Sequence, residues 1–207
     1  MLDANIQTDK ISASIINDFS ILFGTINGSG SATANTTIMR ALFHMGIPVS
    51  GKNIFPSNIQ GQPTWYTIRV NENGFLARQE KNHIVVAMNA VTFKQDLETL
   101  VPGGVLFYAD DITQPAGRDD ITLYPMAINQ LSKAANVPPK LVSYIKNMVY
   151  VGILAEMLGI DLEKIHHALD QHFEGKKTAI DSNYQAIVSA AEWARENLVK
   201  TDPYKVA

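Results

Sequence analysis

The most informative stretch of the sequence is FGTINGSGSATAN, residues Phe23–Asn35. A short apolar run ends at Gly24, a loop of glycines and small hydroxyl residues follows, and helical spacing of apolar residues begins near Ser31. A strand, a glycine loop and a helix in this order present free backbone N–H groups and the positive end of a helix dipole to an anion. The stretch therefore predicts a strand–loop–helix unit that holds a phosphate. The alternative is a tight turn that binds nothing.

Four residues of the loop are candidates for direct contact with the ligand. Gly28 and Gly30 would let the backbone approach a phosphate closely, and Ser29 and Ser31 could donate hydroxyl hydrogen bonds. Their spacing matches neither the dinucleotide fingerprint G-x-G-x-x-G nor a Walker loop that ends in Gly-Lys-Ser/Thr. The loop alone therefore does not identify the ligand.

The charges that follow the loop narrow the choice of ligand. An ordinary NAD site needs an acidic residue about 20 positions later to hold the ribose hydroxyls. No Asp or Glu occurs between Asp18 and Glu72, and the interval carries Arg40, Lys52 and Arg69 instead. The sequence thus disfavours NAD and favours a ligand with an additional phosphate, for which NADP and coenzyme A both qualify.

The rest of the chain alternates strands with helices and then becomes helical. This order predicts an α/β fold, a Rossmann-like parallel-rich sheet with a helical C-terminal part. We expect strands at 19–24, 47–49, 65–70, 83–90, 105–109 and 121–124, and helices at 31–45, 93–100, 141–158, 162–173 and 180–198. Ser50–Pro63 reads as a long loop. The expected organisation is a polar leader at 1–18, one domain at 19–200 and a linker or tail at 201–207.

Composition excludes several kinds of site. The 207 residues are 46% hydrophobic and 18% charged with a net charge of −3, which gives no basic field for nucleic acid. The chain has no cysteine, so it holds no disulfide, thiolate nucleophile or cysteine-ligated cluster. We see no signal peptide and no run approaching the roughly 20 apolar residues of a membrane span. The expectation is a cytoplasmic protein that contacts neither nucleic acid nor membrane.

A second informative stretch is FPSNIQGQPTWYTIRV, Phe55–Val70. Its centre, SNIQGQP, carries uncharged amides that could hydrogen-bond a ligand or pack on a partner. The alternative is a surface loop whose glycine and prolines serve only to turn the chain. Composition leaves both interpretations open.

Three motifs together resemble one protein family. NGSGSATAN, NIFPSNIQGQPTWYTIRV and KNMVYVGILAEMLGID, in this order, resemble the gamma domain of the 2-oxoacid:ferredoxin oxidoreductases. The likeness runs from about Phe19 to Leu198 and is closest to the form fused at the front of the 2-oxoglutarate-type alpha subunit. The resemblance implies a complex that oxidatively decarboxylates a 2-oxoacid, passes electrons to ferredoxin and makes an acyl-CoA.

The resemblance also implies how the work is divided among domains. Thiamine diphosphate with magnesium and the iron–sulfur cluster belong to partner alpha and beta domains or subunits, and this chain helps to receive coenzyme A, so alone it would be inactive. The residues that match the family's glycine loop are Gly28, Ser29, Gly30 and Ser31. The residues that match the loop near the active centre are Ser57, Asn58, Gln60 and Gly61. Lys52 is the nearest cation for the 3′-phosphate, or else a solvated loop lysine.

Other chemistry-bearing residues do not form a recognisable site. His166, His167 and His172 lack the four-residue spacing that puts two imidazoles on one helix face, and His44 and His83 have no evident companions. Asp110 and Asp111 end a strand, where α/β sites lie, but such a pair more often forms a turn. We therefore assign no catalytic and no metal-binding residue.

Two rival functions stay open. Lys146 and Asn147 lie in an otherwise apolar helix, YIKNMVYVGILAEML, which would suit a self-contained NADP-dependent reductase with a catalytic lysine in a helical second domain. A purely structural assembly domain is the third interpretation. It would join a complex without binding a nucleotide.

Overall fold

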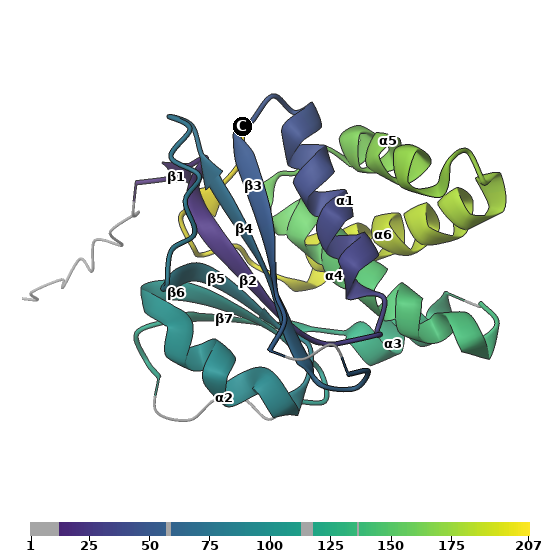
Figure 1. Cartoon of the computed structure of the whole chain (residues 1–207), viewed down its shortest axis with the longest axis horizontal. Coiled ribbons are helices and arrows are strands. Elements are labelled where there is room, and N and C mark those ends of the chain that lie inside the picture. Colours follow the sequence, from purple (N-terminus) through teal and green to yellow (C-terminus); the bar gives the residue numbers. More distant parts are fainter. Residues whose placement is uncertain (1–12, 57–58, 113–117, 136) are drawn as a thin grey trace, which may run out of the picture.

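The computed structural model describes residues 13–56, 59–112, 118–135 and 137–207. A six-stranded sheet in the order β3-β4-β2-β5-β6-β7 forms the centre, with helices on both faces (Figure 1). Its strands are β2 (Asp18–Ile26), β3 (Val49–Ile54), β4 (Pro63–Asn71), β5 (Asn82–Ala87), β6 (Leu100–Ala109) and β7 (Thr122–Met126). The α/β class, the parallel-rich sheet and the helical C-terminal part predicted from the sequence are confirmed.

The sheet is parallel on one side of β2 and antiparallel on the other. Strands β2, β5, β6 and β7 run parallel, whereas β4 pairs antiparallel with both β2 and β3. The prediction of a long loop at 50–63 is wrong for the first residues of that range, because strand β3 continues to Ile54. This strand lies at the edge of the sheet and is largely exposed, so it lacks the apolar pattern that marks the central strands.

The helices divide unequally between the two faces. Figure 1 shows α1, α4, α5 and α6 together on one face and α2 on the other. The helices are α1 (Ser31–His44), α2 (Ala90–Thr99), α3 (Ile128–Ala134), α4 (Val142–Leu158), α5 (Leu162–Phe173) and α6 (Lys177–Asn197), with a 3-10 turn at Pro139–Leu141. The face that carries four helices contains most of the apolar core.

Helix α4 is the central helix of that layer. By length and composition the segment Pro139–Leu158 could cross a membrane, contrary to the expectation from the sequence, but 67% of its most apolar window is buried inside the protein. Gly152 allows α6 to pack directly on α4, because a Cβ at Gly152 would lie 2.1 Å from the backbone oxygen of Ile187. The apolarity of α4 is thus accounted for by packing within the core.

The two segments expected to flank the domain pair with each other. Strand β1 (Ile15–Ile16) runs parallel to β8 (Tyr204–Lys205), and Val206 donates its N–H to the backbone oxygen of Leu158 at 2.8 Å. Tyr204 and Val206 are buried. The packed domain therefore extends beyond the 19–200 boundaries expected from the sequence, since this pairing joins residues too distant in the chain for local patterns to reveal.

Candidate functional site: the glycine-loop cavity

The loop between β2 and α1 needs its two central glycines. Gly28 and Gly30 have φ angles of 84° and 85°, in the left-handed region that favours glycine. A Cβ on Gly30 would also lie 2.4 Å from the ring of Tyr144, and one on Gly28 would lie 2.9 Å from the side chain of Gln60. Backbone conformation and close packing both require glycine at these positions.

The loop after β3 is bonded to the glycine loop. Gly61 donates its N–H to the backbone oxygen of Asn27 at 3.0 Å, and Asn27 donates its own N–H to the oxygen of Gln62 at 2.9 Å. The Asn27 side chain adds a bond to the oxygen of Ile59 at 3.2 Å. The structure thus brings Gln60 and Gly61 to the glycine loop. Ser57 and Asn58, the other two candidates of this loop, lie outside the described residues.

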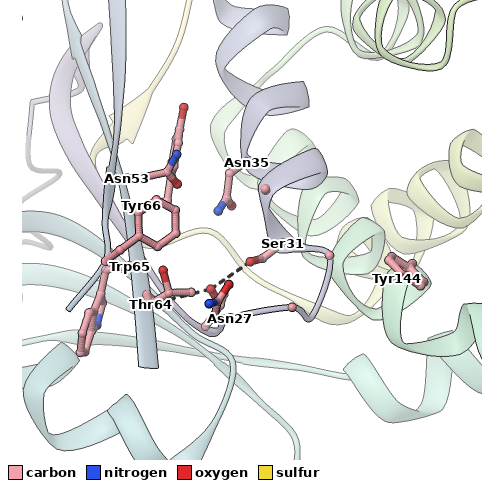
Figure 2. A pocket seen from close by; sticks show the side chains of 13 residues that line it. Asn27, Ser31, Asn35, Asn53, Thr64, Trp65, Tyr66 and Tyr144 are labelled. Carbon is pink, nitrogen blue, oxygen red and sulfur yellow. Dashed lines mark hydrogen bonds between the residues drawn. The ribbon is translucent and has the colours of Figure 1, made fainter. Parts of the chain in front are cut away.

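A cavity of about 350 Å³ opens between the glycine loop, the first turns of α1 and strands β3 and β4. Figure 2 shows Ser31 and Asn35 on α1 opposite the strands that carry Thr64 and Asn53, with Tyr144 on the far side of the loop. Among the described residues, no charged side chain lines this cavity. The group at this cavity that favours an anion is instead the N-terminal end of α1, whose N-cap, Gly30, forms no side-chain capping bond.

The four glycine-loop candidates do not all face the cavity. Gly28, Gly30 and Ser31 line it, whereas Ser29 does not. The Ser29 Oγ atom is enclosed and has no hydrogen-bond partner among the described residues. The Ser31 hydroxyl is bonded to the Thr25 hydroxyl at 3.0 Å, which fixes its direction toward β2 (Figure 2).

Helix α4 is bonded to the glycine loop and to helix α1 through two buried polar side chains. The Asn147 amide donates to the backbone oxygen of Ser29 at 2.8 Å. The Tyr150 hydroxyl donates to Asn35 Oδ1 at 2.8 Å, and burial raises the pKa of Tyr150 well above its ordinary value, so the hydroxyl stays a neutral donor. Asn147 stood out in the sequence as a polar residue in an otherwise apolar helix. Tyr150 was missed, because nothing in the sequence distinguishes it from an ordinary tyrosine of the same helix.

Lys52 is not brought to the glycine loop. The neighbouring residue of β3, Asn53, lines the glycine-loop cavity, and successive side chains of a strand point to opposite faces. Lys52 accordingly lines a different cavity, together with Arg69 and Arg78. Lys52, proposed from the sequence as the nearest cation for the 3′-phosphate, thus lies on the face of β3 that is turned away from this cavity, in a segment that was interpreted as a loop.

A buried carboxyl lies beneath the cavity on the face of the sheet that α2 covers. Asp96 is fully buried and accepts bonds from the indole N–H of Trp65 at 2.6 Å and the hydroxyl of Thr92 at 2.7 Å. Burial raises the pKa of Asp96 to about 6, although the two hydrogen bonds act in the opposite direction. Gly24 makes room for it, because a Cβ there would lie 2.0 Å from Asp96 Oδ2. The carboxyl therefore holds the indole of Trp65 on the face of the sheet that is turned away from the cavity.

The histidines also have companions that the sequence did not reveal. His44 lies edge-on to His167 with ring centroids 4.5 Å apart, and His83 Nδ1 accepts the N–H of Ser20 at 3.1 Å. Helix packing and strand pairing supply these neighbours, which local sequence patterns do not reveal. The described residues contain no group of three His, Asp or Glu side chains that could hold a metal ion.

The lysine that motivated the reductase interpretation is engaged in a structural contact. Lys146 donates to Asn129 Oδ1 at 2.7 Å, and the Asn129 amide donates to Asp110 Oδ1 at 2.7 Å. Asp110 also accepts the backbone N–H of Asn129 in the first turn of α3. The three side chains form one chain of bonds that ties α4 and α3 to the end of β6.

The chain is similar in sequence to a subunit of a 2-oxoacid:ferredoxin oxidoreductase. The alpha subunit of 2-oxoacid:ferredoxin oxidoreductase 2 from Aeropyrum pernix is 23% identical over 218 residues, which cover 86% of this chain and 34% of that protein. The chain thus spans about a third of the length of this curated relative.

Solved structures share the fold. The 2-oxoglutarate:ferredoxin oxidoreductase of Magnetococcus marinus, solved with 2-oxoglutarate, coenzyme A and succinyl-CoA bound, matches 93% of this chain and 33% of its own with a TM-score of 0.82 and 24% identity. The gamma subunit of a keto/oxoacid ferredoxin oxidoreductase from Geobacter sulfurreducens matches 86% of this chain and 99% of its own, with a TM-score of 0.67 and 16% identity. The family model for pyruvate ferredoxin/flavodoxin oxidoreductase matches residues 20–193, most of the chain, and the chain therefore belongs to that family, as its sequence motifs predicted.

Proposed function

We propose that the chain is the gamma domain or subunit of a thiamine-diphosphate-dependent 2-oxoacid:ferredoxin oxidoreductase, with 2-oxoglutarate as the 2-oxoacid, and that its glycine-loop cavity helps to bind coenzyme A. One observation carries the proposal: the N-terminal end of α1 opens, with no capping side chain, onto a cavity lined by uncharged polar residues. The likeness in fold to a structure described with coenzyme A bound supports it.

The cavity offers a different surface to each part of coenzyme A. The backbone N–H groups at the start of α1 would donate to the pyrophosphate oxygens. The amides of Asn27 and Asn53 line the same cavity and would hydrogen-bond polar groups of the ligand. Phe55 and Tyr144 are 52% and 48% exposed, and their rings would pack against the apolar parts of the molecule.

The chemistry itself is assigned to partner domains. Thiamine diphosphate, magnesium and the iron–sulfur cluster would be held by the alpha and beta domains, with ferredoxin reached through the assembled complex in the cytoplasm. The chain supplies no cysteine for a cluster and spans about a third of its curated relative. In this proposal the isolated chain binds coenzyme A without turning over a 2-oxoacid. Family membership favours this interpretation over the NADP-dependent reductase.

Calorimetric titration of the chain with coenzyme A, dephospho-coenzyme A and NADPH tests the proposal. Saturable binding of coenzyme A that exceeds binding of NADPH is the expected result. A preference for NADPH would favour the reductase. If none of the three binds either the chain or the complete complex, the chain is an assembly domain. Comparison with the dephospho form reports separately whether a cation contacts the 3′-phosphate.

A further inference from the structure

We propose that a second cavity, on the opposite face of the sheet from the glycine loop, binds a small phosphate dianion. It measures about 220 Å³ and lies among β2, β3, β4 and the segment that connects β4 to β5. Three cationic side chains line it, from Lys52, Arg69 and Arg78, and no acidic side chain is among its described lining residues. The inference goes beyond the proposed function and does not depend on it.

The fold explains why this cavity exists. Trp65 of β4 directs its indole N–H to Asp96 of α2, so alternate residues after it, Thr67 and Arg69, lie on the face that α2 covers. Helix α2 lies against β2, β5 and β6. The outer part of this face is instead covered by the chain after β4, where the Ser50 hydroxyl donates to the backbone oxygen of Leu76 at 2.8 Å. The cavity lies between this segment and the outer strands of the sheet.

Arg69 has a donor without an acceptor in this hollow. The residue is only 7% exposed, and its two terminal nitrogens donate to the backbone oxygen of Val70 and to Asp18 Oδ1. Its Nε atom is buried and has no partner among the described residues. A buried guanidinium N–H without an acceptor is unfavourable, and an oxyanion in the cavity would accept its bond.

Asn82 presents the complementary group. It is 2% exposed and lines the same cavity, and its Oδ1 atom is likewise buried without a partner in the described part of the chain. A hydrogen-phosphate ion has oxygens that accept from Arg69 and a hydroxyl that donates to Asn82. Its double negative charge suits the exposed ammonium of Lys52 and guanidinium of Arg78 at the rim. The cavity therefore matches this anion in charge and in hydrogen bonding.

Titration with inorganic phosphate at constant ionic strength, adjusted with chloride, tests the site. Wild type should show saturable binding by calorimetry and a phosphate-dependent rise in unfolding temperature. Lys52→Gln and Arg78→Gln each remove one exposed charge without touching the core, and each should weaken binding roughly tenfold through the lost charge-assisted contact. Lys94→Gln, the same change on the exposed surface of α2, is the matched control and should bind as wild type.

Two results would overturn the proposal. Wild type could show no saturable response to phosphate, or the Lys52→Gln/Arg78→Gln double variant could bind phosphate as tightly as Lys94→Gln. Methyl phosphate, tested in parallel, checks the role of Asn82. Its dianion lacks the hydroxyl that would donate to Asn82, so it should bind more weakly than inorganic phosphate, and equal binding would show that Asn82 does not accept a bond from the ligand.

Discussion

The side-chain amide of Asn147 donates to the backbone oxygen of Ser29, 118 residues earlier in the chain, at 2.8 Å. This bond joins the central helix of the C-terminal part to the glycine loop that forms one wall of the cavity. The same amide also donates to the oxygen of Ser143 at 3.0 Å. The helical part of the chain thus fixes the position of the loop from behind.

Asn147→Leu should therefore damage both stability and ligand binding. It leaves the Ser29 oxygen without its buried donor, which should lower the free energy of unfolding by about 1–3 kcal/mol and weaken coenzyme A binding. Urea unfolding and calorimetric titration measure the two effects. The matched control is Asn197→Leu, which loses a bond of the same kind, to the backbone oxygen of Trp193, at the exposed end of α6. Equal loss of coenzyme A affinity in both variants would show that Asn147 does not position the loop.

Gly30→Ala tests the close approach of Tyr144 to the loop. The substitution puts a side chain at φ 85° and within 2.4 Å of the Tyr144 ring. Gly74→Ala is the control: Gly74 has nearly the same backbone conformation, with φ 79°, but a Cβ there would have no atom within 4 Å. The backbone strain common to both should cost about 1–2 kcal/mol in the free energy of unfolding, and Gly30→Ala should cost more because of the ring. Equal destabilisation in urea would mean that Tyr144 moves aside freely.

Asn53→Asp tests whether the glycine-loop cavity receives an anion. Asn53 is exposed on β3 and lines the cavity, so a carboxylate there should repel the ligand's phosphates and weaken coenzyme A binding several-fold at low ionic strength. The loss should shrink as salt is added. Asn53→Leu removes the amide without adding charge, and Asn73→Asp adds the same charge on an exposed turn away from the cavity. A loss in Asn53→Asp no greater than in Asn53→Leu would argue against phosphate groups at this position.

Much of this site could be predicted from the sequence, because the information is local. The apolar run before Gly24 and the helical spacing after Ser31 predicted β2 and α1, and two glycines close together marked the loop.

The parts that the sequence did not predict depend on long-range packing. Strand β3 is an exposed edge strand whose residues VSGKNI show no apolar alternation, so most of it was interpreted as loop, and the face on which Lys52 lies could not be predicted. Asp96 gave no signal either, since its burial depends on Gly24 and Trp65 coming together beneath the sheet. The pairing of β1 with β8 joins the two ends of the described chain.

Asp96 should make stability depend on pH in a defined direction. Its pKa is raised by burial from 3.8 to about 6, so between these values the folded state holds a proton that the unfolded state releases. The free energy of unfolding should then fall as the pH rises from 4 to above 6, by up to about 3 kcal/mol. Asp96→Asn keeps an acceptor for Trp65 and removes the titration. If the free energy of unfolding changed with pH in the same way for Asp96→Asn and for wild type across this range, Asp96 would not carry a raised pKa.

Amide hydrogen exchange, measured with and without coenzyme A, shows whether coenzyme A binds at the N-terminal end of α1. We expect slower exchange on binding in peptides that contain Gly28–Ala32 and in β4 around Thr64, whose residues line the glycine-loop cavity. Peptides of helix α2, which lies outside the cavity, should be unchanged. Saturable binding of coenzyme A with no protection around Gly28–Ala32 would rule out binding at this helix end and place the ligand elsewhere on the protein.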